Sequence, residues 1–298
     1  MRVLLTGGSG QLGRELTKVK PAAIELLALD RAHFNLARSA TLTDTIERLE
    51  PDVILNAAAF TAVDRAEAEA ETAFAVNAQA VGILSRAAKA RGARFVHIST
   101  DFVFDGKANS PYRPSDPTAP VSVYGRSKLK GESDALTALP TTTVVRTSWL
   151  YSSHGRNFVT NMLRMMGERD RLTVVMDQLG SPTWTLPLAE ALWSIVSRED
   201  MPGLWHWCDG GTCSWYEFAC AIQDEGLSRR LLSNRIPIDP VLSAQFPTAA
   251  TRPAMSALDD SATREALGID ALPWRVALGR MLDEMTAEGI PREAEADG

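Results

Sequence analysis

Tyr124 and Lys128 stand four positions apart in the segment Tyr124-Gly125-Arg126-Ser127-Lys128. Residues four apart share one face of a helix, so a helix starting here would bring the phenol and the ammonium together. A tyrosine with a pKa near ~10 is a poor acid–base group at neutral pH, and a neighbouring ammonium lowers that pKa. The pair therefore predicts an acid–base site, although the same spacing alone also fits an ordinary amphipathic helix start.

A second group of polar residues follows an apolar run at 95–98, in the order His97-Ile98-Ser99-Thr100-Asp101. Ligands of parallel sheets bind beyond the carboxyl ends of the strands, so Thr100 is expected to hydrogen-bond a substrate oxygen beside Tyr124. The segment Asn56-Ala57-Ala58-Ala59 ends another apolar run, and its small side chains would let a cofactor lie against the backbone.

The third motif is a glycine-rich loop near the start of the chain, Thr6-Gly7-Gly8-Ser9-Gly10-Gln11-Leu12-Gly13. It follows an apolar run at 3–6 and precedes a helical pattern at 11–19. Glycines at 7, 10 and 13 would let backbone N–H groups at the helix start approach a pyrophosphate. This context predicts a dinucleotide-binding loop.

Two residues after the second apolar run bear on the choice of dinucleotide. Asp30 is placed to accept hydrogen bonds from ribose hydroxyls, which favours NAD. Arg31 follows at once and is placed to neutralise a 2′-phosphate. The residues therefore leave NADH and NADPH both open.

The elements that must position these motifs alternate along the first half of the chain. Strand patterns at 3–6, 24–29, 53–55, 95–98 and 144–145 alternate with helical patterns at 11–19, 41–49, 66–90 and 128–136. This rhythm predicts an α/β fold with a doubly wound parallel sheet of the Rossmann type. We expect a nucleotide-binding domain at 1–150, joined by a later segment near 183–200, and a smaller α/β substrate lobe at 151–298.

Composition narrows the function classes. The chain has 298 residues, 45% of them hydrophobic, and a net charge of −6. The acidic balance argues against a nucleic-acid binder or a protein of anionic membrane surfaces. No apolar run approaches the ~20 residues of a membrane span. Three cysteines, an odd number, argue against a disulfide framework, so we expect reduced thiols and a cytoplasmic location.

Together these motifs resemble the extended short-chain dehydrogenase/reductase superfamily. The resemblance implies a bound NAD(P), with Tyr124 as proton donor and Lys128 orienting the nicotinamide ribose. A closer resemblance, spread over roughly residues 1–260, is to the dTDP-4-dehydrorhamnose reductase family. It lies in the segments 51–64, Ser99-Thr100-Asp101-Phe102-Val103-Phe104-Asp105-Gly106, Arg146-Thr147-Ser148-Trp149, 177–183 and Thr251-Arg252-Pro253.

That family reduces dTDP-4-dehydro-6-deoxy-L-mannose to dTDP-L-rhamnose. The resemblance implies hydride transfer from NADPH or NADH to C4 of the sugar, a proton from Tyr124 to O4, and Thr100 bound to that oxygen. Asp101 and Trp149 would contact the sugar, and Arg252 is our candidate for its diphosphate. The implied cofactor contacts are Gly10, Gln11, Leu12, Asp30, Ala59, Phe60 and Thr61.

One departure from the family pattern is Phe102, where the family usually has tyrosine. We expect weaker sugar binding there, with the chemistry retained. Some members of the family are dimers bridged by Mg²⁺ through acidic residues. Glu15 and Glu190 are candidate metal ligands by that comparison, and a homodimer is an expected partner; exposed helical glutamates are more often simply solvated.

Several alternatives remain. A related 4,6-dehydratase carries Thr-Asp-Glu, and Phe102 cannot replace that glutamate as an acid or base. An epimerase or a ketoreductase of another nucleotide sugar would keep the same motifs. A non-catalytic NADP-binding regulatory subunit, of the kind found in methionine adenosyltransferase, is also open. We expect the four histidines to be structural or exposed, with only His154 a weak candidate near the sugar.

Overall fold

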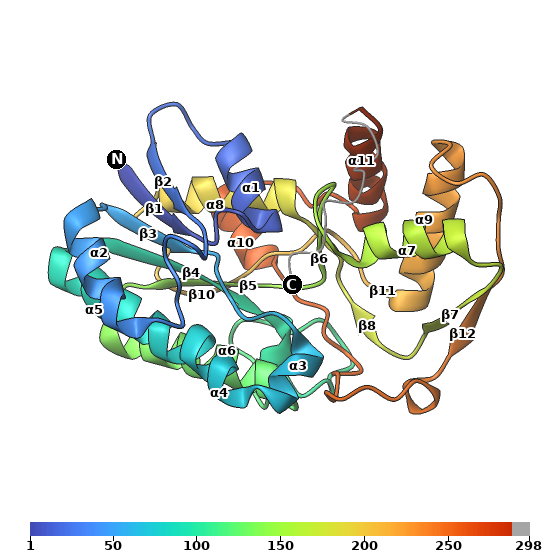
Figure 1. Cartoon of the computed structure of the whole chain (residues 1–298), viewed down its shortest axis with the longest axis horizontal. Coiled ribbons are helices and arrows are strands. Elements are labelled where there is room, and N and C mark those ends of the chain that lie inside the picture. Colours follow the sequence, from blue (N-terminus) through green and yellow to red (C-terminus); the bar gives the residue numbers. More distant parts are fainter. Residues whose placement is uncertain (288–298) are drawn as a thin grey trace.

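Six parallel strands form the central sheet, in the order β10-β5-β4-β3-β1-β2 (Figure 1). In this computed structural model, which describes residues 1–287, every neighbouring pair is parallel. The predicted parallel α/β sheet is confirmed. Because β1 lies between β2 and β3, the strand order reverses there and opens a crevice at the carboxyl ends. The strands are β1 (Arg2–Thr6), β2 (Glu25–Leu29), β3 (Val53–Asn56), β4 (Arg94–Thr100), β5 (Thr143–Thr147) and β10 (Gly203–His206).

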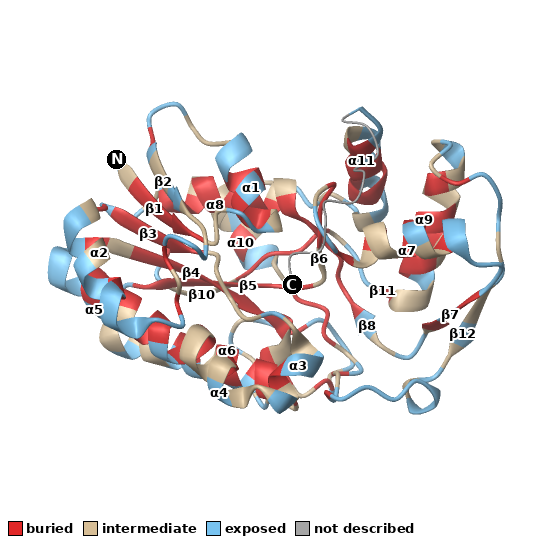
Figure 2. Ribbon diagram, in the orientation of Figure 1, coloured by how far each residue is buried: buried red, intermediate tan, exposed pale blue. Residues whose placement is uncertain are grey.

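Helices cover both faces of the sheet, as Figures 1 and 2 show. One face carries α1 (Gln11–Lys18), α8 (Thr185–Val196) and α10 (Ser261–Leu267), and the other carries α2 (Leu42–Leu49), α5 (Ala80–Arg91) and α6 (Val123–Ala138). Successive strand residues point to opposite faces, so Val3 and Leu5 enter the first core while Leu4 enters the second. Apolar residues on both faces explain why the strands read as continuous hydrophobic runs.

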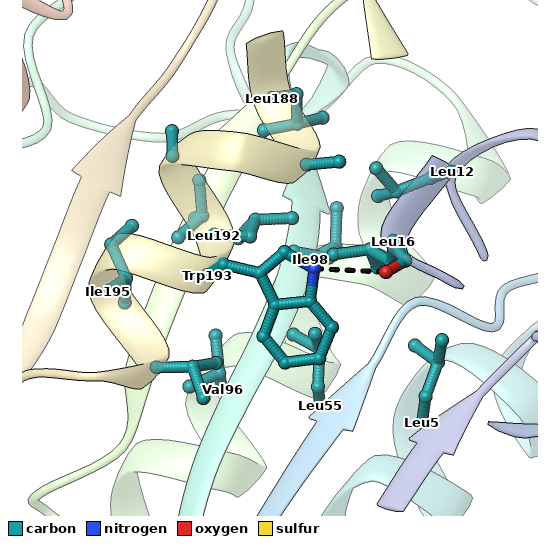
Figure 3. Packing of buried hydrophobic residues seen from close by; sticks show 14 of the residues in the cluster. Leu5, Leu12, Leu16, Leu55, Val96, Ile98, Leu188, Leu192, Trp193 and Ile195 are labelled. Atoms are coloured by element: carbon teal, nitrogen blue, oxygen red, sulfur yellow. Dashed lines mark hydrogen bonds between the residues drawn. The ribbon is translucent and has the colours of Figure 1, made fainter. Parts of the chain in front are cut away.

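Trp193 of α8 anchors the first of these cores (Figure 3). Its side chain is 3% exposed, and its indole Nε1 donates a hydrogen bond to the backbone oxygen of Leu16, at 3.0 Å. The bond ties α8 to α1, the helix that follows the glycine loop. Truncating a buried tryptophan typically costs about 3–5 kcal/mol, so this packing helps fix the loop's position.

A second part of the molecule packs around α7 (Phe158–Glu168), α9 (Trp215–Ser228) and α11 (Trp274–Ala287). Short strand pairs accompany these helices: β6 (Leu150–Tyr151) with β9 (Thr183–Trp184), β7 (Leu172–Val175) with β12 (Ile238–Val241), and β8 (Leu179–Gly180) with β11 (Cys213–Ser214). We retain the two-part division as a proposal, with residues 288–298 outside the described residues. Helices α8 and α10 and strand β10 come from the second half of the chain yet pack with the sheet.

The single helix expected at 66–90 is interrupted. The structure has α3 (Val63–Ala68), α4 (Ala70–Phe74), a π-helical turn at Ala75–Gln79 and then α5. Asn77 in that turn accepts a hydrogen bond from the Phe60 N–H at 2.8 Å and donates to the Phe60 carbonyl at 3.0 Å. The turn thus aims a side-chain amide at the loop after β3, and helical periodicity carries no sign of such a bond.

Two further findings concern the cysteines and the helices. Cys208, Cys213 and Cys220 are all unpaired. No helix within residues 1–287 combines the length and the apolar character that crossing a membrane requires.

Candidate active site

The glycine loop connects β1 to α1 at the carboxyl edge of the sheet. Gly7 has a φ of +74°, which favours glycine. A Cβ on Gly13 would lie 2.1 Å from the Gly7 carbonyl oxygen, so a larger residue would push the loop off the helix. Gly10 precedes the first turn of α1 with no side chain capping it. The helix start therefore offers backbone N–H groups to an anion, as the sequence predicts.

A cleft of about 810 Å³ opens beside this loop, which is within the range of ligand pockets. It lies at the carboxyl ends of the strands and reaches the second part of the molecule at Trp149 and Trp215. Most of the side chains predicted for the site line it. These are Gly7, Gly10, Gln11, Leu12, Gly13, Arg31, Ala59, Phe60, Thr61, Thr100, Asp101, Phe102, Tyr124, Lys128, Trp149 and Arg252.

Asp30 lies apart from that lining. Its carboxylate accepts hydrogen bonds from the backbone N–H of His33 at 3.0 Å and contacts His33 Nδ1 at 2.7 Å. These bonds hold the pKa of Asp30 below its ordinary value. Arg31, the next residue, lines the cleft instead. The predicted contact of Asp30 with a ribose stays a prediction.

Tyr124 and Lys128 lie in the first turns of α6. The hydroxyl of Ser122 accepts the backbone N–H of Gly125 at 3.1 Å and so caps the helix directly before Tyr124. Gly125 lets the helix approach the turn after β4, since a Cβ there would lie 2.2 Å from the carbonyl oxygen of Phe102. The cap and this close contact fix where Tyr124 enters the cleft.

The phenol of Tyr124 is buried, 8% exposed, beside the hydroxyl of Thr100. The ring of Phe102 meets it edge-on, with centroids 5.6 Å apart. Burial raises the pKa of Tyr124 to about 12; the neighbouring hydroxyl of Thr100 opposes the shift, and the charge of Asp101 reinforces it. The lowered pKa expected from Lys128 is therefore wrong for this structure, because desolvation dominates.

Thr100 and Asp101 stand together at the end of β4. Thr100 Oγ1 donates to Asp101 Oδ1 at 2.9 Å and accepts the backbone N–H of Phe102 at 3.2 Å. Burial raises the pKa of Asp101 to about 6, although hydrogen bonds from Ser256 and Thr100 oppose the shift. The carboxyl group is thus close to its titration range at neutral pH.

The side chain of Lys128 ends at two residues of β4. Nζ donates to the backbone oxygen of Ile98 at 2.7 Å and lies 3.4 Å from His97 Nε2. Burial lowers the pKa of Lys128 to about 8, while the charge of Glu132 opposes this shift. The hydrogen-bond partners of Lys128 Nζ therefore lie on β4, and Tyr124 lies one turn earlier on α6.

One wall of the cleft is aromatic. Trp149 has a φ of +47°, and its ring stacks on that of Trp215 with centroids 3.4 Å apart. A Cβ on Gly180 would lie 2.4 Å from the Trp149 ring, so the glycine makes room for it. Trp149 is half-buried at this wall of the cleft, and its contact with the sugar stays a prediction. Trp215 was missed: the capping signature Ser214–Glu217 marks the start of α9, but nothing in it indicates which tryptophan faces the cleft.

Arg252 lines the cleft but is already paired. Its Nη2 lies 2.6 Å from Asp64 Oδ2, and the pair joins the chain after β12 to α3. The same carboxylate accepts the backbone N–H of Ala250 at 3.0 Å, and these bonds hold the pKa of Asp64 below its ordinary value. Binding of a diphosphate by Arg252 stays a prediction.

The two predicted metal ligands fall in different surroundings. Glu15 is fully buried on α1, and its carboxylate lies within 4.8 Å of ligand atoms of His154 and Glu284. Glu284 also accepts a hydrogen bond from Lys18 at 2.6 Å, so the positive charge next to this group comes from a lysine side chain. Within residues 1–287, Glu190 is exposed on α8 and lies outside that group. A metal bound by Glu15 and Glu190 stays a prediction.

Gln11 joins the glycine loop to the second part of the molecule. Its side-chain oxygen accepts hydrogen bonds from Ser152 Oγ and Asn157 Nδ2, both at 3.0 Å. Asn157 also caps α7. Sequence reasoning predicted Gln11 only as a cofactor contact, and the bonds over more than 140 positions could not be read from local pattern.

Comparison with known proteins gives consistent matches over nearly the whole chain. The family model described as the RmlD substrate binding domain matches residues 1–287. A dTDP-4-dehydrorhamnose reductase of Aggregatibacter actinomycetemcomitans is 40% identical over 284 residues, covering 93% of this chain and 97% of that protein.

Solved structures agree with these matches. The dTDP-4-dehydrorhamnose reductase of Clostridium acetobutylicum has a TM-score of 0.89 at 34% identity, covering 96% of this chain and all of that one. The enzyme of the same name from Bacillus anthracis, solved in complex with NADP, has a TM-score of 0.88 at 33% identity. It covers 95% of this chain and 99% of that one.

Proposed function

The chain belongs to the dTDP-4-dehydrorhamnose reductase family, and we propose that it reduces dTDP-4-dehydro-6-deoxy-L-mannose to dTDP-L-rhamnose. It is an NAD(P)H-dependent oxidoreductase. The observation that carries the proposal is one cleft lined both by the glycine loop and by Thr100, Tyr124 and Lys128. A dinucleotide and a sugar can meet there at the carboxyl edge of the sheet.

The residues of the cleft fit a nicotinamide dinucleotide. The loop between β1 and α1 has no room for a Cβ at Gly13, and the start of α1 presents its N–H groups to a pyrophosphate. Ala59, Phe60 and Thr61 line the cleft after β3 and would hold the cofactor against the backbone. When bound, the reduced nicotinamide supplies the hydride that C4 of the sugar accepts. Arg31 supports a 2′-phosphate, so both NADPH and NADH are included in the proposal.

Tyr124 gives its proton to O4 of the sugar. The raised pKa of about 12 keeps the phenol protonated at neutral pH but makes it a weaker acid, so the transfer depends on the negative charge that develops on O4. As O4 gains negative charge, the phenol becomes the nearest acid, and the ammonium of Lys128 on the same helix face stabilises the phenolate that remains. Thr100, whose hydroxyl lies beside Tyr124, orients O4 next to the donor.

The sugar nucleotide is held by the walls of the cleft. Asp101 accepts a hydrogen bond from a hydroxyl of the sugar, and Trp149 covers one face of the sugar ring. Phe102 offers an apolar edge where the family usually has a hydroxyl. Arg252 exchanges Asp64 for the diphosphate, or binds both, since a guanidinium has five N–H groups.

The test is the loss of NADPH or NADH absorbance with purified protein and enzymatically made dTDP-4-dehydro-6-deoxy-L-mannose. We expect turnover that falls about 10²–10⁴-fold in Tyr124→Phe, the range that general acids contribute. Tyr216→Phe is the matched control, because that tyrosine lies on α9 and does not line the cleft among the described residues.

Other outcomes would replace the proposal. No turnover from protein that still binds a cofactor would favour the regulatory-subunit reading or another nucleotide sugar. Cofactor that stays tightly bound through purification, in stoichiometric amount, would favour an epimerase. A homodimer, a magnesium ion and a cytoplasmic location stay predictions from the sequence.

A further inference from the structure

Four buried polar side chains form a line across the sheet that ends at Lys128. Thr6 Oγ1 on β1 donates to Asn56 Oδ1 on β3 at 2.5 Å, and Asn56 Nδ2 lies 3.0 Å from His97 Nδ1 on β4. His97 Nε2 in turn lies 3.4 Å from Lys128 Nζ on α6. All four residues are buried, with at most 2% of their surface exposed. The line therefore connects the interior of the sheet to the cleft.

His97 stays uncharged in this position. Burial and the neighbouring charge of Lys128 hold the pKa of the imidazole well below its ordinary value. A neutral imidazole has one nitrogen that donates and one that accepts. Because both nitrogens have partners, the proton on His97 must suit Asn56 on one side and Lys128 on the other.

Two arrangements satisfy the line. When Asn56 Nδ2 donates to Nδ1, the hydrogen of His97 lies on Nε2 and can be donated only to a neutral Lys128 amine. When Lys128 is an ammonium, Nε2 must accept, Nδ1 carries the hydrogen, and the Asn56 amide turns its oxygen toward it. An amide has a donor and an acceptor of nearly the same shape, so after this turn Asn56 still bonds to both neighbours: Nδ2 donates to Thr6 Oγ1, whose hydroxyl hydrogen rotates away from Asn56.

We propose that His97 is a positioning residue for Lys128: its neutral ring changes tautomer as the lysine gains or loses a proton, and so keeps Nζ in one place in both charge states. The carbonyl of Ile98 supplies the second fixed point for Nζ, at 2.7 Å. With the pKa of Lys128 lowered to about 8, both states are populated just above neutral pH. The kinetic consequence rests on the proposed function, whereas the tautomer change does not.

Other charged groups face Lys128 but leave this role to His97. Glu132, one turn later on α6, is bound through both carboxylate oxygens to Arg146 of β5, at 2.9 and 2.6 Å. Its negative charge raises the pKa of Lys128. Tyr124 lies one turn earlier on α6 and is itself influenced by Asp101.

The direct test is ¹⁵N NMR of the histidine rings in cofactor-free wild-type protein, titrated from about pH 6 to about pH 10. We expect His97 Nδ1 and Nε2 to exchange their protonated and unprotonated signals, with a midpoint near pH 8 that coincides with the titration of Lys128 Cε. Ring nitrogens that keep the same signals over this range, or a ring that becomes charged, would overturn the proposal.

Two variants provide the kinetic test. His97→Phe keeps a ring but has neither donor nor acceptor, and we expect kcat to fall about tenfold with KM for the sugar nucleotide unchanged. His97→Gln reaches the position of Nε2 with an amide that can present either atom, and should return kcat to within about threefold of wild type. Wild-type kcat in His97→Phe, or no recovery in His97→Gln, contradicts the proposal. An inactive wild type would instead contradict the proposed function, and the NMR result would still decide the role of His97.

Discussion

Asp209 is a buried carboxyl group whose ionisation costs stability, so replacing it with a neutral amide should stabilise the protein. Its Oδ2 accepts the backbone N–H of Trp184 at 2.8 Å and the hydroxyl of Tyr151 at 3.4 Å, and the residue is 1% exposed. Burial raises the pKa of Asp209 from 3.8 to about 7, although the bonds from Trp184 and Tyr151 oppose the shift. In the folded state the carboxyl thus prefers to be neutral.

The sign of the effect follows from that raised pKa. As pH rises from about 4 to about 7, the unfolded chain loses this proton before the folded protein does, so stability falls over that window. At 1.36 kcal/mol for each pKa unit, the cost above pH 7 is about 4 kcal/mol. Asp209→Asn keeps an oxygen for both bonds and carries no charge, so it removes most of this cost.

The assay is guanidinium unfolding followed by tryptophan fluorescence at pH 8 and at pH 4.5. We expect Asp209→Asn to exceed the wild type by about 4 kcal/mol at pH 8 and by little at pH 4.5. Asp170→Asn, at an exposed position, is the control for a change of carboxylate to amide. A gain at pH 8 that is equal at pH 4.5, or no gain at all, would refute the reasoning.

Four further predictions concern the cleft. In Gly13→Ala the added Cβ would lie 2.1 Å from the Gly7 oxygen, so calorimetry should show cofactor binding lost while the fold remains. Phe102→Tyr should lower KM for the sugar nucleotide about two- to tenfold through one new hydrogen bond, and an unchanged KM would count against the predicted pocket. Arg252→Ala should raise that KM with kcat nearly constant, and no change would remove the arginine from the diphosphate site. Because Lys128 loses its proton as pH rises through about 8, kcat/KM should fall above that pH, and a flat profile to pH 10 would contradict a charged lysine in the reaction.

Local pattern was sufficient for the motifs that depend on neighbours in sequence. The glycine loop is one example: the strand before it, the helix after it and the spacing of Gly7, Gly10 and Gly13 are all local, and the structure brings the three into one cleft. The spacing of Tyr124 and Lys128 likewise placed both on one helix, because i and i+4 share a face.

Properties that depend on depth could not be predicted this way. The pKa of Tyr124 moved opposite to expectation because burial of the phenol outweighs the nearby ammonium, and burial is set by the whole fold. His97 read as a structural residue because nothing in its own segment points to Asn56 or Lys128, which lie 41 and 31 positions away. The stacking of Trp149 on Trp215 joins the loop before β6 to the start of α9, 66 positions away, and periodicity gives no sign of it either.

The proposed direction and site of reduction can be tested most directly with reduced cofactor that carries deuterium at the transferred position of the nicotinamide. After turnover of dTDP-4-dehydro-6-deoxy-L-mannose by the wild-type protein, mass spectrometry and NMR should find one deuterium, at C4 of the sugar product. Tyr124→Phe, with the cleft otherwise intact, should form little of this product. Deuterium at another carbon, or its absence from a product that nevertheless forms, would contradict the account.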